Sequence, residues 1–217
     1  MKRPKALVVL GTRPEAVKLF PVIRALEKDP RLDVDVAVTG QHKEMVDQIL
    51  EPFGIVPRAS LDIMEPGQSL NGIASRVLPR LDALYSEIEP CIVLVQGDTT
   101  SAFCAALAGF HRRIVVAHVE AGLRSYNRFH PYPEESNRRM IGAVADLHLA
   151  PTRRSAENLL REGVPRSDIV ITGNTAVDAA RWAAARAPAP AHAGPTLLLT
   201  RHRPEVFGAP RTAMLRA

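Results

Sequence analysis

The sequence has few aromatic residues, two cysteines and no long apolar run. Aromatic residues make up 5% of its 217 residues, and the cysteines are Cys91 and Cys104. Neither lies near a second cysteine or a histidine at metal-binding spacing, so no metal site or disulfide is indicated. No apolar stretch reaches the roughly 18 residues of a membrane span. The apolar run 6–10 lacks a cleavage site after it, so we expect a buried strand, not a signal peptide, and a cytoplasmic protein without a membrane partner.

The chain also lacks the common short motifs of cofactor and nucleophile sites. It contains no G-x-G-x-x-G, no Walker A loop and no G-x-S-x-G, so we expect no dinucleotide cofactor and no serine nucleophile. The net charge is +5, with a balance of −2 over residues 1–110 and +7 over residues 111–217. The basic residues are scattered singly or in pairs, without interleaved aromatics. This pattern favours an anionic small molecule over a nucleic acid as the partner.

Short apolar runs alternate with amphipathic segments along most of the chain. The alternation predicts a Rossmann-like α/β fold with a parallel sheet and helices on both faces. Strands are predicted at 5–10, 33–38, 91–95, 114–118, 146–150 and 168–172, with an extended piece at 57–64. Helices are predicted after Thr12, at 43–53, 68–89 and 100–110, from Glu134, and at 153–162 and 175–187.

A stretch rich in proline and alanine divides the chain near its end. We expect an N-terminal Rossmann-like domain over 1–186, a linker over 187–195, and the start of a second domain over 196–217. The second part opens with a predicted strand at 196–200. Its 22 residues are too few to bury a core. The sequence therefore predicts either a truncated second domain or a tail that docks on another surface.

Charged residues follow several of the predicted strands. In GTRPEAVK (11–18), Arg13 and Lys18 accompany a helix N-terminus, which attracts phosphate; a capped helix with a solvated arginine is the alternative. Asp98 follows a strand and Gly97, and could instead cap the next helix. Glu120 ends another strand, with an ion pair to Arg124 as its alternative.

Two further segments add acid–base groups. Glu134 and Glu135 begin a helix, where the helix dipole also favours acids. Adjacent helical residues point in different directions, so we expect one to face a cleft and the other to pair with an arginine. His202 follows the predicted strand 196–200, and a tail histidine without a role is the alternative. Since parallel strands bind ligands at their carboxyl ends, these groups predict one cleft for an anionic substrate and acid–base chemistry.

Eight segments in one order resemble the non-hydrolysing UDP-N-acetylglucosamine 2-epimerase family. They are GTRPEAVK, TGQHKEMVDQIL, IMEPGQSL, QGDTTSAF, HVEAGLR, PYPEESNRR, ITGNTAVDA and RHRPEVFG. The resemblance implies a GT-B-like architecture, with the active site between two Rossmann-like domains. It also implies that UDP-GlcNAc and UDP-ManNAc are interconverted for cell-envelope polysaccharide synthesis, by elimination and re-addition of UDP with inversion at C2 and without a cofactor.

Residue roles follow from the resemblance by motif position. It implies that Asp98, Glu120, Glu134 and His202 are catalytic, and that Arg13 and Lys18 bind the diphosphate. Gln41, His42 and Gln68 fall in segments that bind a second, activating UDP-GlcNAc in bacterial members. The family further implies a homodimer.

Two departures from the family pattern affect the expected activity. The last segment reads HRPEVFG where the family has HRRENFG, so Pro204 and Val206 replace polar residues. The rest of the second domain, which would hold the uridine, does not follow Ala217. We therefore expect impaired activity from this 217-residue chain. The alternatives are a non-catalytic fragment that binds a sugar nucleotide or a partner, and a GT-B glycosyltransferase.

Overall fold

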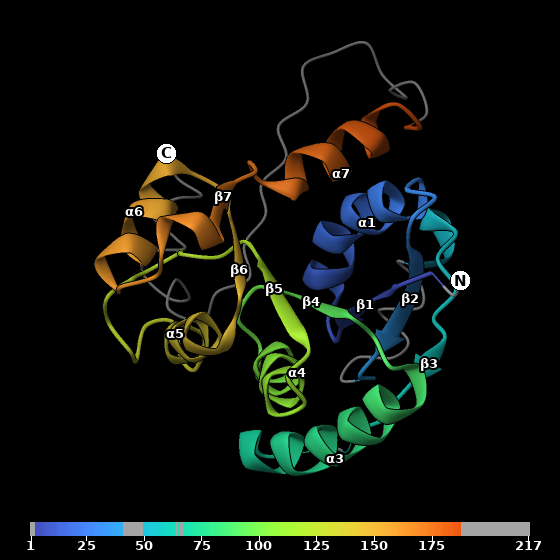
Figure 1. The fold of residues 1–217 in the computed structure, drawn as a ribbon, viewed down its shortest axis with the longest axis horizontal. Helices are drawn as coiled ribbons and strands as arrows, with labels where there is room; N and C mark the ends of the chain where they lie inside the picture. The colour runs from blue at the N-terminus through green and yellow to red at the C-terminus, as the bar shows by residue number, and fades with distance from the viewer. Residues whose placement is uncertain (1–2, 41–49, 64, 66, 188–217) are drawn as a thin grey trace, which may run out of the picture. The chain divides into compact units, whose positions relative to one another are not determined.

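The computed structural model describes residues 3–40, 50–63, 65 and 67–187, and these form a parallel α/β domain (Figure 1). Its strands are β1 (Lys5–Leu10), β2 (Asp33–Val38), β3 (Ala59–Ser60), β4 (Ile92–Gln96), β5 (Val115–Val119), β6 (Leu147–Ala150) and β7 (Ile169–Ile171). The helices are α1 (Arg13–Glu27), α3 (Leu70–Ile88), α4 (Thr100–His111), α5 (Glu134–Val144), α6 (Arg153–Arg161) and α7 (Thr175–Ala184), with a 3-10 turn η1 at Arg166–Asp168.

The seven strands form one sheet in the order β3-β2-β1-β4-β5-β6-β7, and all the pairs are parallel. The predicted Rossmann-like parallel sheet is therefore confirmed. β1 lies between β2 and β4, so the strand order reverses direction beside it. Such a switch point leaves a crevice at the carboxyl ends of the two central strands, because the helices that follow them cover opposite faces.

Alternating side chains of β1 explain why helices cover both faces of the sheet. Leu7 and Val9 pack into a core with α3, α4 and α5. Ala6, Val8 and Leu10 pack into a second core with α1 and with Trp182 of α7. A strand buried on both faces reads as a continuous apolar run, as KALVVL does. Figure 1 shows α3, α4 and α5 on one side of the sheet and α1 and α7 on the other.

Some predicted elements fall outside the part of the chain that the structure describes. Of the helix predicted at 43–53, the described residues 50–53 are helical. The predicted linker from 188 onward and the predicted strand at 196–200 lie beyond the described residues. A compact unit ends at Ala185. Among the described helices, none is long and apolar enough to cross a membrane.

The turn after β5 requires glycine for two reasons. Gly122 has φ +83°, and a Cβ built on it would lie 2.2 Å from the backbone oxygen of Ser155. Gly163, after α6, has a similar φ of +88° but nothing within 4 Å of its Cβ position. The two glycines therefore share the backbone constraint, and Gly122 alone adds a close approach between two segments.

We predict that Gly122→Ala destabilises the domain more than Gly163→Ala does. Left-handed backbone costs a non-glycine residue about 1–2 kcal/mol, which applies to both variants. The clash with Ser155 adds a further ~1–3 kcal/mol at Gly122. Urea unfolding of the two variants measures the difference in the free energy of unfolding. Equal losses would show that the backbone around Ser155 relaxes to accept a methyl group.

Candidate active site

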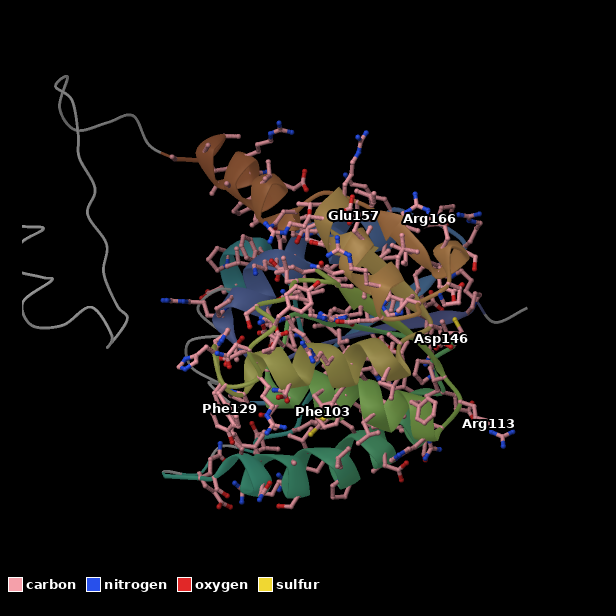
Figure 2. All side chains as sticks on the ribbon, turned by 90° about the vertical axis from the view of Figure 1, so that its left-hand side faces the viewer. Phe103, Arg113, Phe129, Asp146, Glu157 and Arg166 are labelled. Atoms are coloured by element: carbon pink, nitrogen blue, oxygen red, sulfur yellow. The ribbon has the colours of Figure 1, made fainter. Side chains whose placement is uncertain are left out.

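A cavity of about 470 Å³ lies at the carboxyl edge of the sheet. It is lined by the sequence-predicted residues Arg13, Lys18, Asp98, Glu120 and Glu134. These residues come from the segments that follow β1, β4 and β5 and from the start of α5. Figure 2 shows the two ends of the sheet. Phe129 follows β5 and lies at one end, whereas Arg113 and Asp146, which precede β5 and β6, lie at the other. The structure thus brings five separately predicted residues together at the switch point.

Glu120 directly follows β5 and is held by one side chain from α1 and one from the end of β4. The Lys18 ammonium contacts both carboxylate oxygens, at 2.8 and 2.7 Å. The side-chain amide of Gln96, the last residue of β4, donates to Oε2 of Glu120. Glu120 also has φ +65°, a conformation that costs a non-glycine residue about 1–3 kcal/mol and is frequent at functional sites. The expected alternative, an ion pair with Arg124, is wrong, because Arg124 pairs with Glu162.

Asp98 is held by two consecutive residues of α5. The Arg138 guanidinium donates to Oδ2 of Asp98 at 2.5 Å, and the Asn137 amide donates to its backbone oxygen at 2.8 Å. The alternative role as a helix cap is wrong. Thr99 is the N-cap of α4, and its hydroxyl accepts a hydrogen bond from the Ala102 amide. Asp98 therefore lines the cavity, and its carboxylate is bonded to Arg138.

The adjacent acids at the start of α5 point in different directions, as the helical geometry predicted. Glu135 is fully buried and pairs with Arg138 at 2.9 Å and Arg139 at 3.3 Å. Burial raises the pKa of Glu135, but hydrogen bonds from Ser125 and Arg138 outweigh burial and hold it below its usual value. Glu134 instead lines the cavity, and its buried Oε2 has no hydrogen-bond partner among the described residues. Glu134 thus keeps a free acceptor at the cavity wall.

A second buried carboxylate, Glu15, was not predicted and joins two of the loops around the cavity. Its Oε2 accepts hydrogen bonds from the backbone amides of Gly11 and Thr12, at 2.5 and 2.8 Å. Its Oε1 accepts one from the Thr99 hydroxyl at 2.6 Å. Burial raises the pKa of Glu15 despite these bonds. The loops after β1 and β4 are therefore fixed to each other across the crevice.

Sequence reasoning also missed Gln96 and Arg138 as parts of the site. Gln96 is 2% exposed at the end of an otherwise apolar strand. A buried amide needs a partner, so its position is a usable signal that other groups converge there. Arg138 follows Glu135 at helical i,i+3 spacing, which predicts their ion pair but not the contact with Asp98, 40 residues away.

Of the remaining predicted residues, the structure describes Gln68 alone. Gln68 precedes α3, where its side-chain oxygen accepts from the Glu65 amide at 3.3 Å and from Arg76. It is not among the residues that line the cavity. Gln41, His42 and His202 lie outside the described residues. Within the described ranges, no group of three or more histidine, cysteine or acidic residues could hold a metal ion.

His118 lies in β5, two residues before Glu120, and supports the turn that carries Asp98. Its Nε2 lies 2.8 Å from the Gly97 carbonyl oxygen, so this nitrogen carries the proton and donates. His118 is 1% exposed and is paired in register with His148 of β6. Burial lowers the pKa of His118 to about 4, and nearby positive charges on His148 and Arg124 act in the same direction. The imidazole is therefore neutral at physiological pH.

The fold and the cavity define a Rossmann-like α/β domain with a charged ligand site at its switch point. A family model described as UDP-N-acetylglucosamine 2-epimerase matches residues 24–217. The chain therefore belongs to the UDP-N-acetylglucosamine 2-epimerase family, which confirms the resemblance seen in its motifs.

Individual relatives agree with this assignment. The UDP-N-acetylglucosamine 2-epimerase of Bacillus subtilis is 47% identical over 222 residues, covering all of this chain and 58% of the relative. That of Escherichia coli K12 is 51% identical over 178 residues, covering 82% and 47% of the two chains. The chain thus spans about half the length of the curated relatives it matches.

Solved structures support the fold in the same way. The UDP-GlcNAc 2-epimerase of Neisseria meningitidis, solved with UDP-GlcNAc bound, has a TM-score of 0.82 at 44% identity. The match covers 84% of this chain and 49% of the Neisseria meningitidis chain. The lipopolysaccharide galactosyltransferase WaaB has a TM-score of 0.58 at 14% identity, over 79% of this chain and 45% of its own, which shows a shared fold alone.

We predict that His118 makes the domain less stable below pH 6.5. The pKa of His118 is about 4 in the folded chain, and its ordinary value, which applies to the unfolded chain, is 6.5. The unfolded chain therefore binds the proton more readily. The stability from the neutral imidazole is present above pH 6.5 and is lost as the pH falls from 6.5 toward 4. The full loss is about 3 kcal/mol.

Urea unfolding at pH 7.5 and 4.5 measures this effect. The free energy of unfolding should fall by about 2 kcal/mol more in the wild-type chain than in His118→Gln. His111→Gln, at an exposed position in α4, is the matched control and should behave as the wild type does. The same pH dependence in His118→Gln would assign the acid sensitivity to other groups.

Proposed function

We propose that this chain provides the first-domain side of a site that interconverts UDP-GlcNAc and UDP-ManNAc. The observation that carries the proposal is the meeting of Asp98, Glu120 and Glu134, from three distant segments, in one cavity with Arg13 and Lys18. Relatives named as UDP-N-acetylglucosamine 2-epimerases, and a related structure solved with UDP-GlcNAc, support the same substrate.

The proposed reaction needs separate acidic and basic groups. The C2 proton of the sugar has no neighbouring carbonyl group, so simple removal and return is unfavourable. In an elimination, a carboxylate takes the C2 proton, a C1–C2 double bond forms, and the C1–O bond breaks with its electrons leaving on UDP. Re-addition of UDP at C1, with a proton delivered to the opposite face of C2, gives the epimer. Both steps use general acid–base catalysis and stabilisation of the departing diphosphate.

The contacts suggest how these tasks are divided. Glu134 lines the cavity, and its buried Oε2 has no partner among the described residues, so we assign its carboxylate to the substrate. Arg13 is exposed in the first turn of α1, where a guanidinium and helix amides suit a diphosphate. Lys18 already contacts both oxygens of Glu120. We therefore propose that the main role of Lys18 is to hold Glu120, and that binding of the diphosphate is its secondary role.

Other parts of the proposal rest on motif position alone. His202 would complete the catalytic set from outside the described residues. Gln41, His42 and Gln68 would bind a second, activating UDP-GlcNAc. Homodimer formation and a cytoplasmic location belong to the same set of proposals. Membership of the epimerase family leaves no support for the glycosyltransferase alternative, since the likeness to WaaB concerns the fold alone.

We predict that the chain exchanges the C2 proton of UDP-GlcNAc with solvent. Proton NMR in D₂O should show loss of the C2 signal and formation of UDP-ManNAc that carries deuterium at C2. Asp98→Asn and Glu120→Gln should each lower the exchange rate by roughly 100-fold or more, as expected for loss of an acid–base group.

A surface acid provides the control for these variants. Glu157→Gln, on an exposed position of α6, should leave the rate unchanged. UDP-GlcNAc that binds by calorimetry but shows no C2 exchange would reject the catalytic proposal. That result would support the alternative of a non-catalytic sugar-nucleotide-binding module.

A further inference from the structure

We propose that Arg138 is a positioning residue that holds Asp98 for the reaction and fixes the loop after β5 to the same point. This inference rests on the proposed function for the role of Asp98. Arg138 is 8% exposed and does not belong to the residues that line the cavity. It therefore acts through Asp98 and Glu135 rather than by touching a substrate.

The guanidinium of Arg138 bridges two carboxylates with different groups. Nη1 donates to Asp98 at 2.5 Å, whereas Nη2 and Nε donate to Oε2 of Glu135 at 2.9 and 3.3 Å. A guanidinium is planar and rigid, so the two contacts fix the direction of the Asp98 carboxylate relative to α5. A lysine has a single ammonium on a flexible stem and could not reproduce both contacts with this geometry.

Glu135 continues this chain of contacts into the loop after β5. Its two oxygens accept hydrogen bonds from the backbone amides of Ser125 at 3.0 Å and Tyr126 at 3.1 Å. Tyr126 has φ +60°, and its hydroxyl donates to Asn158 of α6 at 2.6 Å. Arg138 therefore connects Asp98 in the cavity with the backbone that begins this loop.

This loop exposes three aromatic side chains and contributes one residue to the cavity lining. Tyr126, Phe129 and Tyr132 are 53%, 56% and 63% exposed. Leu123, two residues before Ser125, lines the cavity. In Figure 2, Phe129 lies beyond the end of the sheet and away from Asp146. The loop is thus placed to respond when the Asp98–Arg138–Glu135 contacts are altered.

Arg139 provides a matched comparison on the same helix. It also donates to Glu135, from Nε at 3.3 Å, but its side chain is 45% exposed. Its contacts within the described part of the chain do not include Asp98. Arg138 and Arg139 thus share the Glu135 partner. They differ in burial, in the contact with Asp98, and in the Tyr126 ring, over which the Arg139 guanidinium lies at 6.0 Å.

The test compares Arg138→Ala, Arg138→Lys and Arg139→Ala in the 217-residue protein. With UDP-GlcNAc in D₂O, Arg138→Ala should lower kcat for C2 exchange by roughly 100-fold, as a small misplacement of a catalytic group does. KM should change little, because Arg138 lies outside the cavity lining. Arg139→Ala should keep kcat near the wild-type value. Arg138→Lys keeps the positive charge and is therefore less prone to unfold. Its kcat should still be lowered, because lysine cannot make both contacts.

Added guanidinium ion distinguishes positioning from general destabilisation. Millimolar guanidinium should restore part of the kcat of Arg138→Ala, because it can refill the site between Asp98 and Glu135. It should not restore Asp98→Asn. Equal kcat values for Arg138→Ala and Arg139→Ala, or no rescue, would overturn the proposal.

A second measurement without substrate separates this proposal from the proposed function. NMR hydrogen exchange should show faster exchange of the Ser125 amide, which shares Oε2 of Glu135 with Arg138, and shifted Asp98 signals, in Arg138→Ala but not in Arg139→Ala. A wild-type chain without C2 exchange would reject the epimerase function, and these signals would then report on positioning alone. Unchanged Asp98 and Ser125 signals would reject the link itself.

Discussion

The ion pair between Lys18 and Glu120 joins two parts of the chain that are 102 residues apart, and the cavity depends on it. It connects α1, which follows β1, with the end of β5. β4 lies between these strands, and its last residue, Gln96, donates to the same carboxylate. Helix α1 and the ends of β4 and β5 are therefore held together through Glu120. The switch point supplies the crevice, and this contact places charged groups within it.

Most buried polar groups around the cavity have partners; within the described residues, Oε2 of Glu134 and Nδ1 of His118 do not. Glu15 accepts three hydrogen bonds, and Glu135 is bonded to two arginines and two backbone amides. The hydrogen-bonding capacity of Glu134 is not fully used, because its buried Oε2 has no partner in the described part of the chain. An unsatisfied buried acceptor costs about 1–3 kcal/mol. Glu134 differs in this respect from Glu15 and Glu135, whose carboxylates are bonded to several described groups.

The sequence predicted the sheet well because its signals are local. The runs KALVVL and DVDVAV gave β1 and β2 with their observed ends, and parallel strands must bring their carboxyl ends to one edge. That rule is why Arg13, Asp98 and Glu120 could be expected in one cavity. Partners could not be predicted in this way. Arg124 lies four residues from Glu120 but pairs with Glu162, since a charge alone does not reveal which of several opposite charges the fold brings near.

Asp98 and Glu120 are held by separate sets of contacts. Glu120 is bound by Lys18 and Gln96, from α1 and β4, whereas Asp98 is bound by Arg138 and Asn137, both from α5. A change in charge or position at one acid therefore need not displace the other. The elimination and re-addition that we propose require a base and an acid that act at different moments. Two carboxylates anchored to different elements meet that requirement better than a directly hydrogen-bonded pair, in which each proton transfer would alter both groups.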